Sequence, residues 1–117
     1  YDRKDAFRWI SAIRLPDFVT PVDFAWAVET AEKKKKLDCS AAEFLRVEEG
    51  LCVQMMHLGP YDTEIESVAR MEAYLRERGY VTDFSDARLH HEIYLSDPRK
   101  AAPEKWKTVI RHPVRRG

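Results

Sequence analysis

The alternation of helix and strand patterns most constrains the fold of this chain of 117 residues. Thr20 and Pro21 form a typical helix start, an N-cap followed by proline in the first turn. A second helix starts at Asp62 or Thr63 and ends at Gly79. Strands are predicted at residues 7–13, 42–48, 51–58, 89–96 and 105–112. This order predicts an α+β fold, an antiparallel sheet with helices on one face.

The amino-acid composition limits the classes of partner that the chain is expected to bind. The 20 basic and 20 acidic side chains cancel, whereas nucleic-acid-binding proteins usually carry a basic excess or stripe. The basic run at residues 33–36 falls where the first helix should end, which suits the helix dipole; the alternative is a phosphate-binding patch. No apolar stretch approaches the roughly 20 residues of a membrane span, and no signal peptide is recognised. We expect a cytoplasmic protein, with reduced cysteines, that binds neither nucleic acid nor membrane.

The stretch from His90 to Asp97 carries the most chemical information. Alternation divides its side chains between two faces of a strand. The predicted core face holds two apolar residues and consists of His91, Ile93 and Leu95. The opposite face carries His90, Glu92, Tyr94 and Ser96. Two interpretations of that polar face stay open: it is exposed to solvent, or it is a pocket floor where Glu92 meets a cation, a polar group or a water.

Other patterns exclude several kinds of site. His90 and His91 point to opposite faces and His57 lies on another strand, so no metal site is predicted. The glycines are scattered singly, which excludes a glycine-rich phosphate loop, and no cofactor is expected. Met55 and Met56 point to opposite faces, so one of them either lines an adaptable pocket or fills the core.

Several segments resemble one family. Residues 91–100 (HEIYLSDPRK) are similar to the signature strand of the gyrase-inhibitor-like small-molecule-binding domains. Residues 59–62 (GPYD) resemble the turn that opens their second-module helix, and residues 107–114 resemble their closing strand. Residues 3–9 and 14–20 resemble one branch of the family, proteins related to cyclopropanoid cyclopropyl hydrolases. Those enzymes open the strained cyclopropane of DNA-alkylating natural products by adding water.

The resemblance implies a single domain over residues 1–117, built from two strand–helix–strand–strand modules with a ligand groove between them. Residues 1–50 match the later part of the first module and residues 51–117 the second. The chain starts at Tyr1 without a counterpart of the opening strand, so we expect part of the groove wall to be absent from it. A second chain, as in a homodimer, is one way to supply that wall.

The resemblance also implies the roles of individual residues. Glu92 is expected either to activate the attacking water or to pair with a cationic drug, and partial desolvation is expected to raise its basicity. Tyr61 is the second catalytic candidate, a hydrogen-bond donor to the substrate. The expected binding residues are Trp9, Tyr94, His90, Met55, His57 and Trp106. Each tryptophan has a core position as its alternative, and for Trp26 the core is favoured.

Three functions follow. The first is hydrolysis of a strained cyclopropane, without a cofactor, in a hydrophobic aromatic substrate. The second is multidrug binding or effector sensing without chemistry, with an aromatic or cationic ligand in the same groove. The third, inhibition of gyrase, is supported by the family name alone.

Overall fold

The computed structural model describes residues 9–117. The chain divides into two compact units, one ending at Arg46 and the other spanning Val47–Gly117. Each unit is described by itself. No helix in the described part of the chain is long and apolar enough to cross a membrane.

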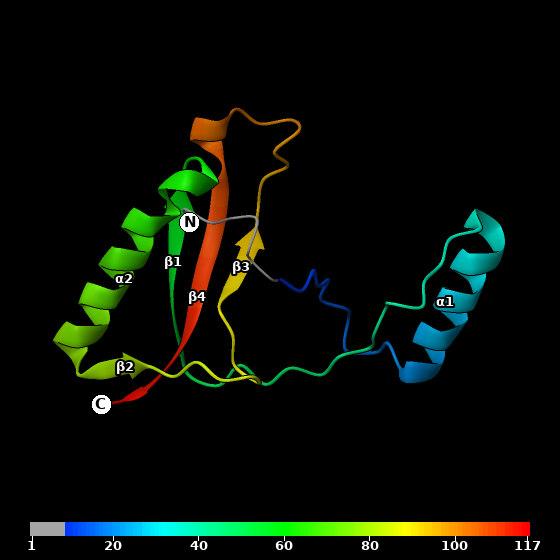
Figure 1. Ribbon diagram of the computed structural model, residues 1–117, viewed down its shortest axis with the longest axis horizontal. Helices are drawn as coiled ribbons and strands as arrows, with labels where there is room; N and C mark the ends of the chain where they lie inside the picture. Colours follow the sequence, from blue (N-terminus) through cyan, green and yellow to red (C-terminus); the bar gives the residue numbers. More distant parts are fainter. Residues whose placement is uncertain (1–8) are drawn as a thin grey trace. The chain divides into compact units, whose positions relative to one another are not determined.

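The first unit contains helix α1, Pro21–Lys35 (Figure 1). The Thr20 side chain accepts a hydrogen bond from the backbone N–H of Asp23, and the Asp23 side chain accepts one from the backbone N–H of Thr20. The predicted cap is therefore confirmed. The helix ends at Lys36, in the left-handed conformation, and lysines fill its last turn. Trp26 is 68% exposed, so its predicted core position is wrong.

Two predicted strands are absent from this unit. Residues 9–13 and 42–48 adopt no strand, and the start of the predicted 7–13 strand lies outside the described residues. An alternating pattern gives a segment strand propensity, but a strand also needs a neighbour for its backbone N–H and C=O groups. The described residues of this unit offer no such neighbour. Phe44 instead packs on the helix, with its ring centroid 5.6 Å from that of Phe24.

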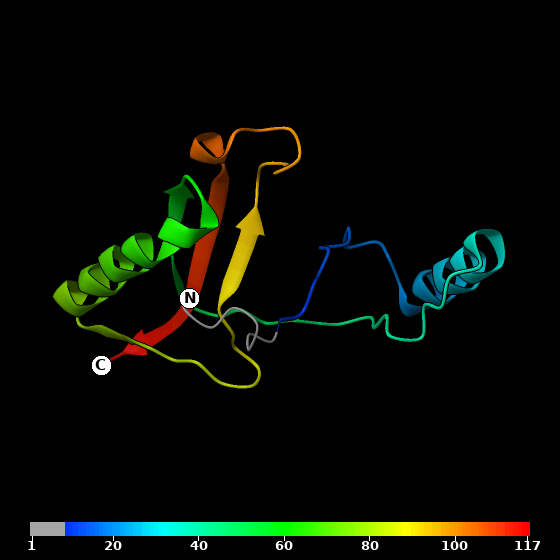
Figure 2. The same ribbon diagram turned by 45° about the horizontal axis from the view of Figure 1, so that its top comes forward.

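The second unit holds the sheet (Figures 1 and 2). Its elements are β1 (Cys52–Leu58), a 3-10 turn (Tyr61–Thr63), α2 (Glu64–Arg78), β2 (Tyr80–Thr82), β3 (His91–Tyr94), a 3-10 turn (Pro103–Lys105) and β4 (Lys107–Arg116). β4 is central and pairs antiparallel with every other strand. β1 lies along one edge of β4, and β3 and β2 follow one another along the other edge. The α+β class with an antiparallel sheet is confirmed.

Helix α2 covers one face of this sheet, packing on β1 and β2. Its buried residues recur every three or four positions and are Glu64, Ser67, Met71 and Leu75. Met71 and Leu75 form the apolar core with Ile110 and Val114 of β4. Ile65, the residue after Glu64, is 57% exposed and lies outside this buried face. Gly79 caps the helix at φ 78°, a conformation that glycine adopts without strain, as predicted.

No strand precedes the turn at Glu49 and Gly50, so β1 does not form a hairpin with the segment before it. Gly50 does have a positive φ of 64°. The short strand β2 was not predicted, since its three residues are too few to show a period. It pairs with residues 114–116, beyond the end of the strand predicted at 105–112.

Candidate functional site

The register of the sheet decides which face Glu92 lies on. Glu92 lies opposite Ile110, which is fully buried, and Met55 lies opposite Ile110 from the other side. These residues share the face that α2 covers. The prediction that His91 and Ile93 form the core face is therefore wrong. The reason is that β4 and α2 carry the core, while Ile93 and Leu95 remain partly or largely exposed on the other face.

The carboxylate of Glu92 is the centre of a polar cluster. The Tyr94 hydroxyl donates to its Oε2 at 2.5 Å, and Nε2 of His90 lies 3.2 Å from its Oε1. Hydrogen bonds with His90, Glu64 and Tyr94 lower the pKa of Glu92 to about 2, against the opposing effect of burial. The expected rise in basicity is thus wrong, because these hydrogen bonds outweigh desolvation. The side chain of Glu92 is therefore ionised at neutral pH.

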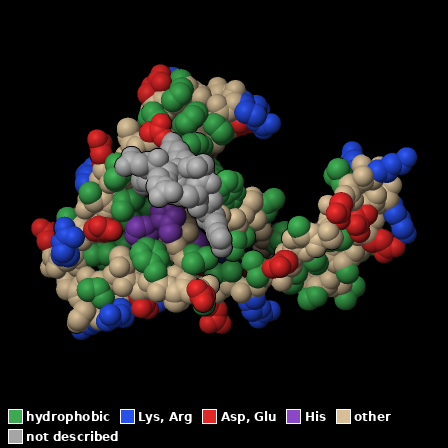
Figure 3. Space-filling view, viewed as in Figure 1, with side chains coloured by type: hydrophobic (Ala, Val, Ile, Leu, Met, Phe, Trp, Pro, Cys, Tyr) green, Lys and Arg blue, Asp and Glu red, His purple; other side chains and the backbone are tan. Residues whose placement is uncertain are grey.

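His112 extends the cluster into the core. Its Nε2 lies 2.7 Å from Nδ1 of His90, and the residue is 4% exposed. Burial, with a smaller electrostatic effect of the neighbouring His90, lowers the pKa of His112 to about 4, so the His112 ring is neutral at neutral pH. The Phe84 ring meets it edge-on at 5.0 Å. No sequence pattern pointed to His112, although its even spacing from Ile110 on one strand is a usable signal. In the space-filling view, histidine side chains gather beside hydrophobic ones on this face (Figure 3).

Three aromatic rings lie beside the carboxylate. Tyr61 stacks on Trp106 with centroids 4.6 Å apart, and it meets Tyr94 at 5.4 Å. The Trp106 indole N–H donates to the backbone oxygen of Ala101, which fixes the ring. Burial raises the pKa of both tyrosines, and for Tyr94 the hydrogen bond to Glu92 adds to that rise. Both phenols are therefore neutral hydrogen-bond donors. Tyr94 is 57% exposed, so the cluster opens on one side.

The remaining predicted binding residues are placed differently. Met55 is half-buried on the Glu92 face. His57 is 4% exposed and uses both ring nitrogens within the fold: Nδ1 meets Ser67 Oγ at 2.7 Å, and Nε2 meets the backbone oxygen of Pro60 at 2.8 Å. This histidine ties β1 to the start of α2. Trp9 belongs to the other unit and is 79% exposed, so its place in a pocket stays a prediction.

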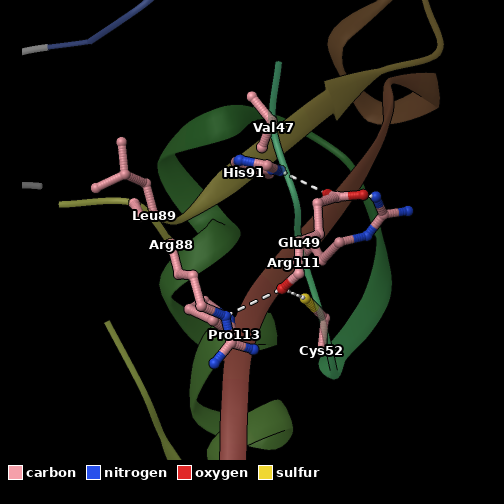
Figure 4. A pocket seen from close by; sticks show the side chains of 9 residues that line it. Val47, Glu49, Cys52, Arg88, Leu89, His91, Arg111 and Pro113 are labelled. Carbon is pink, nitrogen blue, oxygen red and sulfur yellow. Dashed lines mark hydrogen bonds and ion pairs between the residues drawn. The ribbon is translucent and has the colours of Figure 1, made fainter. Parts of the chain in front are cut away.

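A second polar cluster lies on the opposite face of the sheet (Figure 4). Glu49 Oε1 meets both His91 Nδ1 and Arg111 Nη1 at 2.8 Å. The hydrogen bond from Arg111, more than that from His91, lowers the pKa of Glu49. Arg88 donates to the backbone oxygens of Glu49 and Leu51 at 3.1 and 2.6 Å. These contacts hold residues 47–51 against the sheet. The polar groups of this cluster are therefore used by hydrogen bonds within the fold.

A groove lies beside α2, and Glu92 is not among the residues that line it. It is lined by Leu51, Cys52, Val53, Tyr74, Leu75, Arg78, Tyr80 and Val114. Within residues 9–117, no three His, Cys, Asp or Glu side chains are grouped so as to hold a metal ion. Cys39 and Cys52 are free thiols. The carboxylate, the two histidines and the stacked rings are therefore the strongest candidate site in the described residues.

Residues 13–115 match the GyrI-like small molecule binding domain family. The chain is similar to a hydrolase from Listeria innocua, at 50% identity over 87% of this chain and 52% of that one, with a TM-score of 0.81. An uncharacterized conserved protein of the same organism matches at 51% identity over 87% and 50%, with a TM-score of 0.82. A further Listeria innocua hydrolase matches at 50% identity over 87% and 50%, with a TM-score of 0.79.

No curated protein matches the chain. The chain spans about half the length of the solved structures it matches. The family match covers most of the sequence, however, and it includes the strand of Glu92 and the turn of Tyr61. The chain belongs to the family of GyrI-like small-molecule-binding domains.

Proposed function

We propose that this chain binds a flat, hydrophobic aromatic molecule and hydrolyses a strained cyclopropane in it, with Glu92 activating the water. The observation that carries the proposal is the ionised carboxylate of Glu92 lying next to the stacked rings of Tyr61 and Trp106. Two similar solved structures are hydrolases. The cyclopropanoid class of substrate is inferred from the sequence resemblance of residues 3–9 and 14–20.

The proposed reaction balances without a cofactor. Water attacks a ring carbon, and the carbon–carbon bond that breaks sends its electron pair to the conjugated carbonyl oxygen. Glu92 takes the proton from the water, and the phenol of Tyr61 donates a hydrogen bond to the developing phenolate. A carboxylate with a pKa of about 2 is a weak base. Glu92 therefore acts mainly by orienting the water and stabilising its developing positive charge, while ring strain drives the step.

A second candidate function is binding without chemistry. A carboxylate that stays ionised beside aromatic rings attracts a cationic aromatic ligand through both charge and cation–π contacts. The same low pKa that weakens Glu92 as a base favours this role. Under this alternative, the ligand leaves the site chemically unchanged.

The test uses the full chain and a cyclopropane-containing DNA-alkylating natural product, with the product followed by mass spectrometry. We expect the wild type to add one water to the ligand. Glu92→Gln should slow this by roughly 100-fold or more, because the neutral amide neither takes the proton nor stabilises the positive charge that develops on the water. The exposed Glu104 supplies the matched control, Glu104→Gln, which should behave as wild type. Undiminished turnover in Glu92→Gln would refute water activation. Recovery of bound, unchanged ligand from the wild type would favour the binding function.

A further inference from the structure

Glu64 is the most deeply buried carboxyl group among the described residues. It is the first residue of α2 and only 1% exposed. It belongs to the helix face that meets the sheet, one turn before Ser67. Charged side chains are almost never buried so completely unless they have a partner. No sequence pattern marked this glutamate as different from Glu66, which lies two residues later and is exposed.

Glu64 is buried on the helix face that meets the sheet, and Glu92 lies opposite the buried Ile110 on the sheet face that α2 covers. A side-chain hydrogen bond with Glu64 is one of the causes that lower the pKa of Glu92. Two carboxylates at hydrogen-bonding distance cannot both be ionised in a buried place, so one of them holds a proton. Glu92 accepts from the Tyr94 hydroxyl and lies within hydrogen-bonding distance of His90. Those donors favour the charged form of Glu92. The dipole of α2 favours charge on Glu64, but this effect is weaker than charge-assisted hydrogen bonds.

We propose that Glu64 is a positioning residue that keeps its proton at neutral pH and donates it to Glu92, so that the two carboxyl groups form a pair with a single negative charge. Tyr94 and His90 hold Glu92 from the exposed side, whereas Glu64 holds it from beneath. A ligand that displaces Tyr94 or His90 therefore leaves Glu92 oriented. The pair offers a ligand one negative charge, which suits a monocationic or neutral polar group rather than a dication.

The part that Glu64 plays in turnover rests on the proposed function, whereas the shared proton does not. The first measurement is therefore independent of any substrate. The full chain, with carbon-13 in its glutamate carboxyl groups, is studied at neutral pH by infrared spectroscopy and by carbon NMR. We expect one protonated glutamate in the wild type. Its signal should disappear in Glu64→Gln and persist in the matched control Glu66→Gln. A wild type without a protonated glutamate at neutral pH would overturn the proposal.

The second measurement is the titration of Glu92 over the pH range in which each variant stays folded by circular dichroism. The amide of Glu64→Gln is a neutral donor of nearly the same shape, so the midpoint of Glu92 should hardly move. Glu64→Ala removes the donor, so the midpoint should rise by about one pH unit or more. A marked fall of the midpoint in Glu64→Gln would mean that Glu64 carries a negative charge, which contradicts the proposal.

Turnover gives the final test of the positioning role. If the proposed function holds, the acid limb of the kcat/KM profile should move to higher pH in Glu64→Ala and return to its place in Glu64→Gln. A purely structural role would lower activity at every pH without moving that limb. If the chain has no hydrolase activity, the spectroscopic results still decide whether the proton is shared.

Discussion

The charge on Glu92 should stabilise the sheet unit in a way that depends on pH. The pKa of Glu92 falls from its ordinary 4.5 to about 2 in the folded chain. At about 1.4 kcal/mol per pKa unit, this difference is worth about 3 kcal/mol. Because the folded pKa is the lower one, the stabilisation is complete above the unfolded pKa and is lost as pH falls towards the folded one. The wild type should lose about 2 kcal/mol from this group between about pH 5 and about pH 3.

Glu92→Gln removes this titration. Its amide oxygen still accepts a hydrogen bond from Tyr94, so the fold should survive the change. Urea unfolding at a series of pH values, followed through the NMR amide signals of β4, measures the sheet unit separately from α1. The free energy of unfolding of Glu92→Gln should fall less steeply below about pH 5 than that of wild type, by the roughly 2 kcal/mol estimated above. Glu104→Gln should follow the wild type. Parallel curves for Glu92→Gln and wild type would refute the assignment of a low pKa to Glu92.

Two further predictions concern buried partners of this site. Burial and the neighbouring His90 lower the pKa of His112 from 6.5 to about 4 in the folded chain. The stability that depends on a neutral His112 is therefore complete above its unfolded pKa of 6.5 and is lost as the pH falls to its folded pKa of about 4. In urea unfolding, the wild type should lose up to roughly 3 kcal/mol of unfolding free energy from this group over that pH window, and His112→Gln should not show this loss. The same pH dependence of the unfolding free energy in His112→Gln and wild type would contradict this. Ser67→Ala should cost about 1–3 kcal/mol, because it leaves Nδ1 of the buried His57 without its hydrogen bond. Equal unfolding midpoints for Ser67→Ala and wild type would argue against that bond.

Local signals predicted several elements of the fold correctly. The capped start of α1, the apolar run of β1, the Gly79 cap and the strands around residues 91–94 and 107–112 all follow from chemistry within a few residues. Residues 9–13 and 42–48 have strand-like patterns but no strand, because pairing depends on a partner that the pattern does not contain. The burial of Glu64 also lies beyond sequence reasoning, since helical spacing places Glu64 with Met71 and Leu75 but favours an apolar residue there.

The position of Glu92 illustrates how the core of a sheet can mislead a sequence argument. Alternation correctly placed Glu92 and Tyr94 on one face and Ile93 on the other. The apolar residues of that one strand, however, did not decide which face the helix covers. β4 decides it, because its buried residues Thr108, Ile110 and His112 lie on the face that α2 covers, and Glu92 is in register with Ile110. A glutamate on the covered face needs hydrogen-bond donors to remain charged. Tyr94 and Glu64 supply them together with His90, which is why the covered face holds the site.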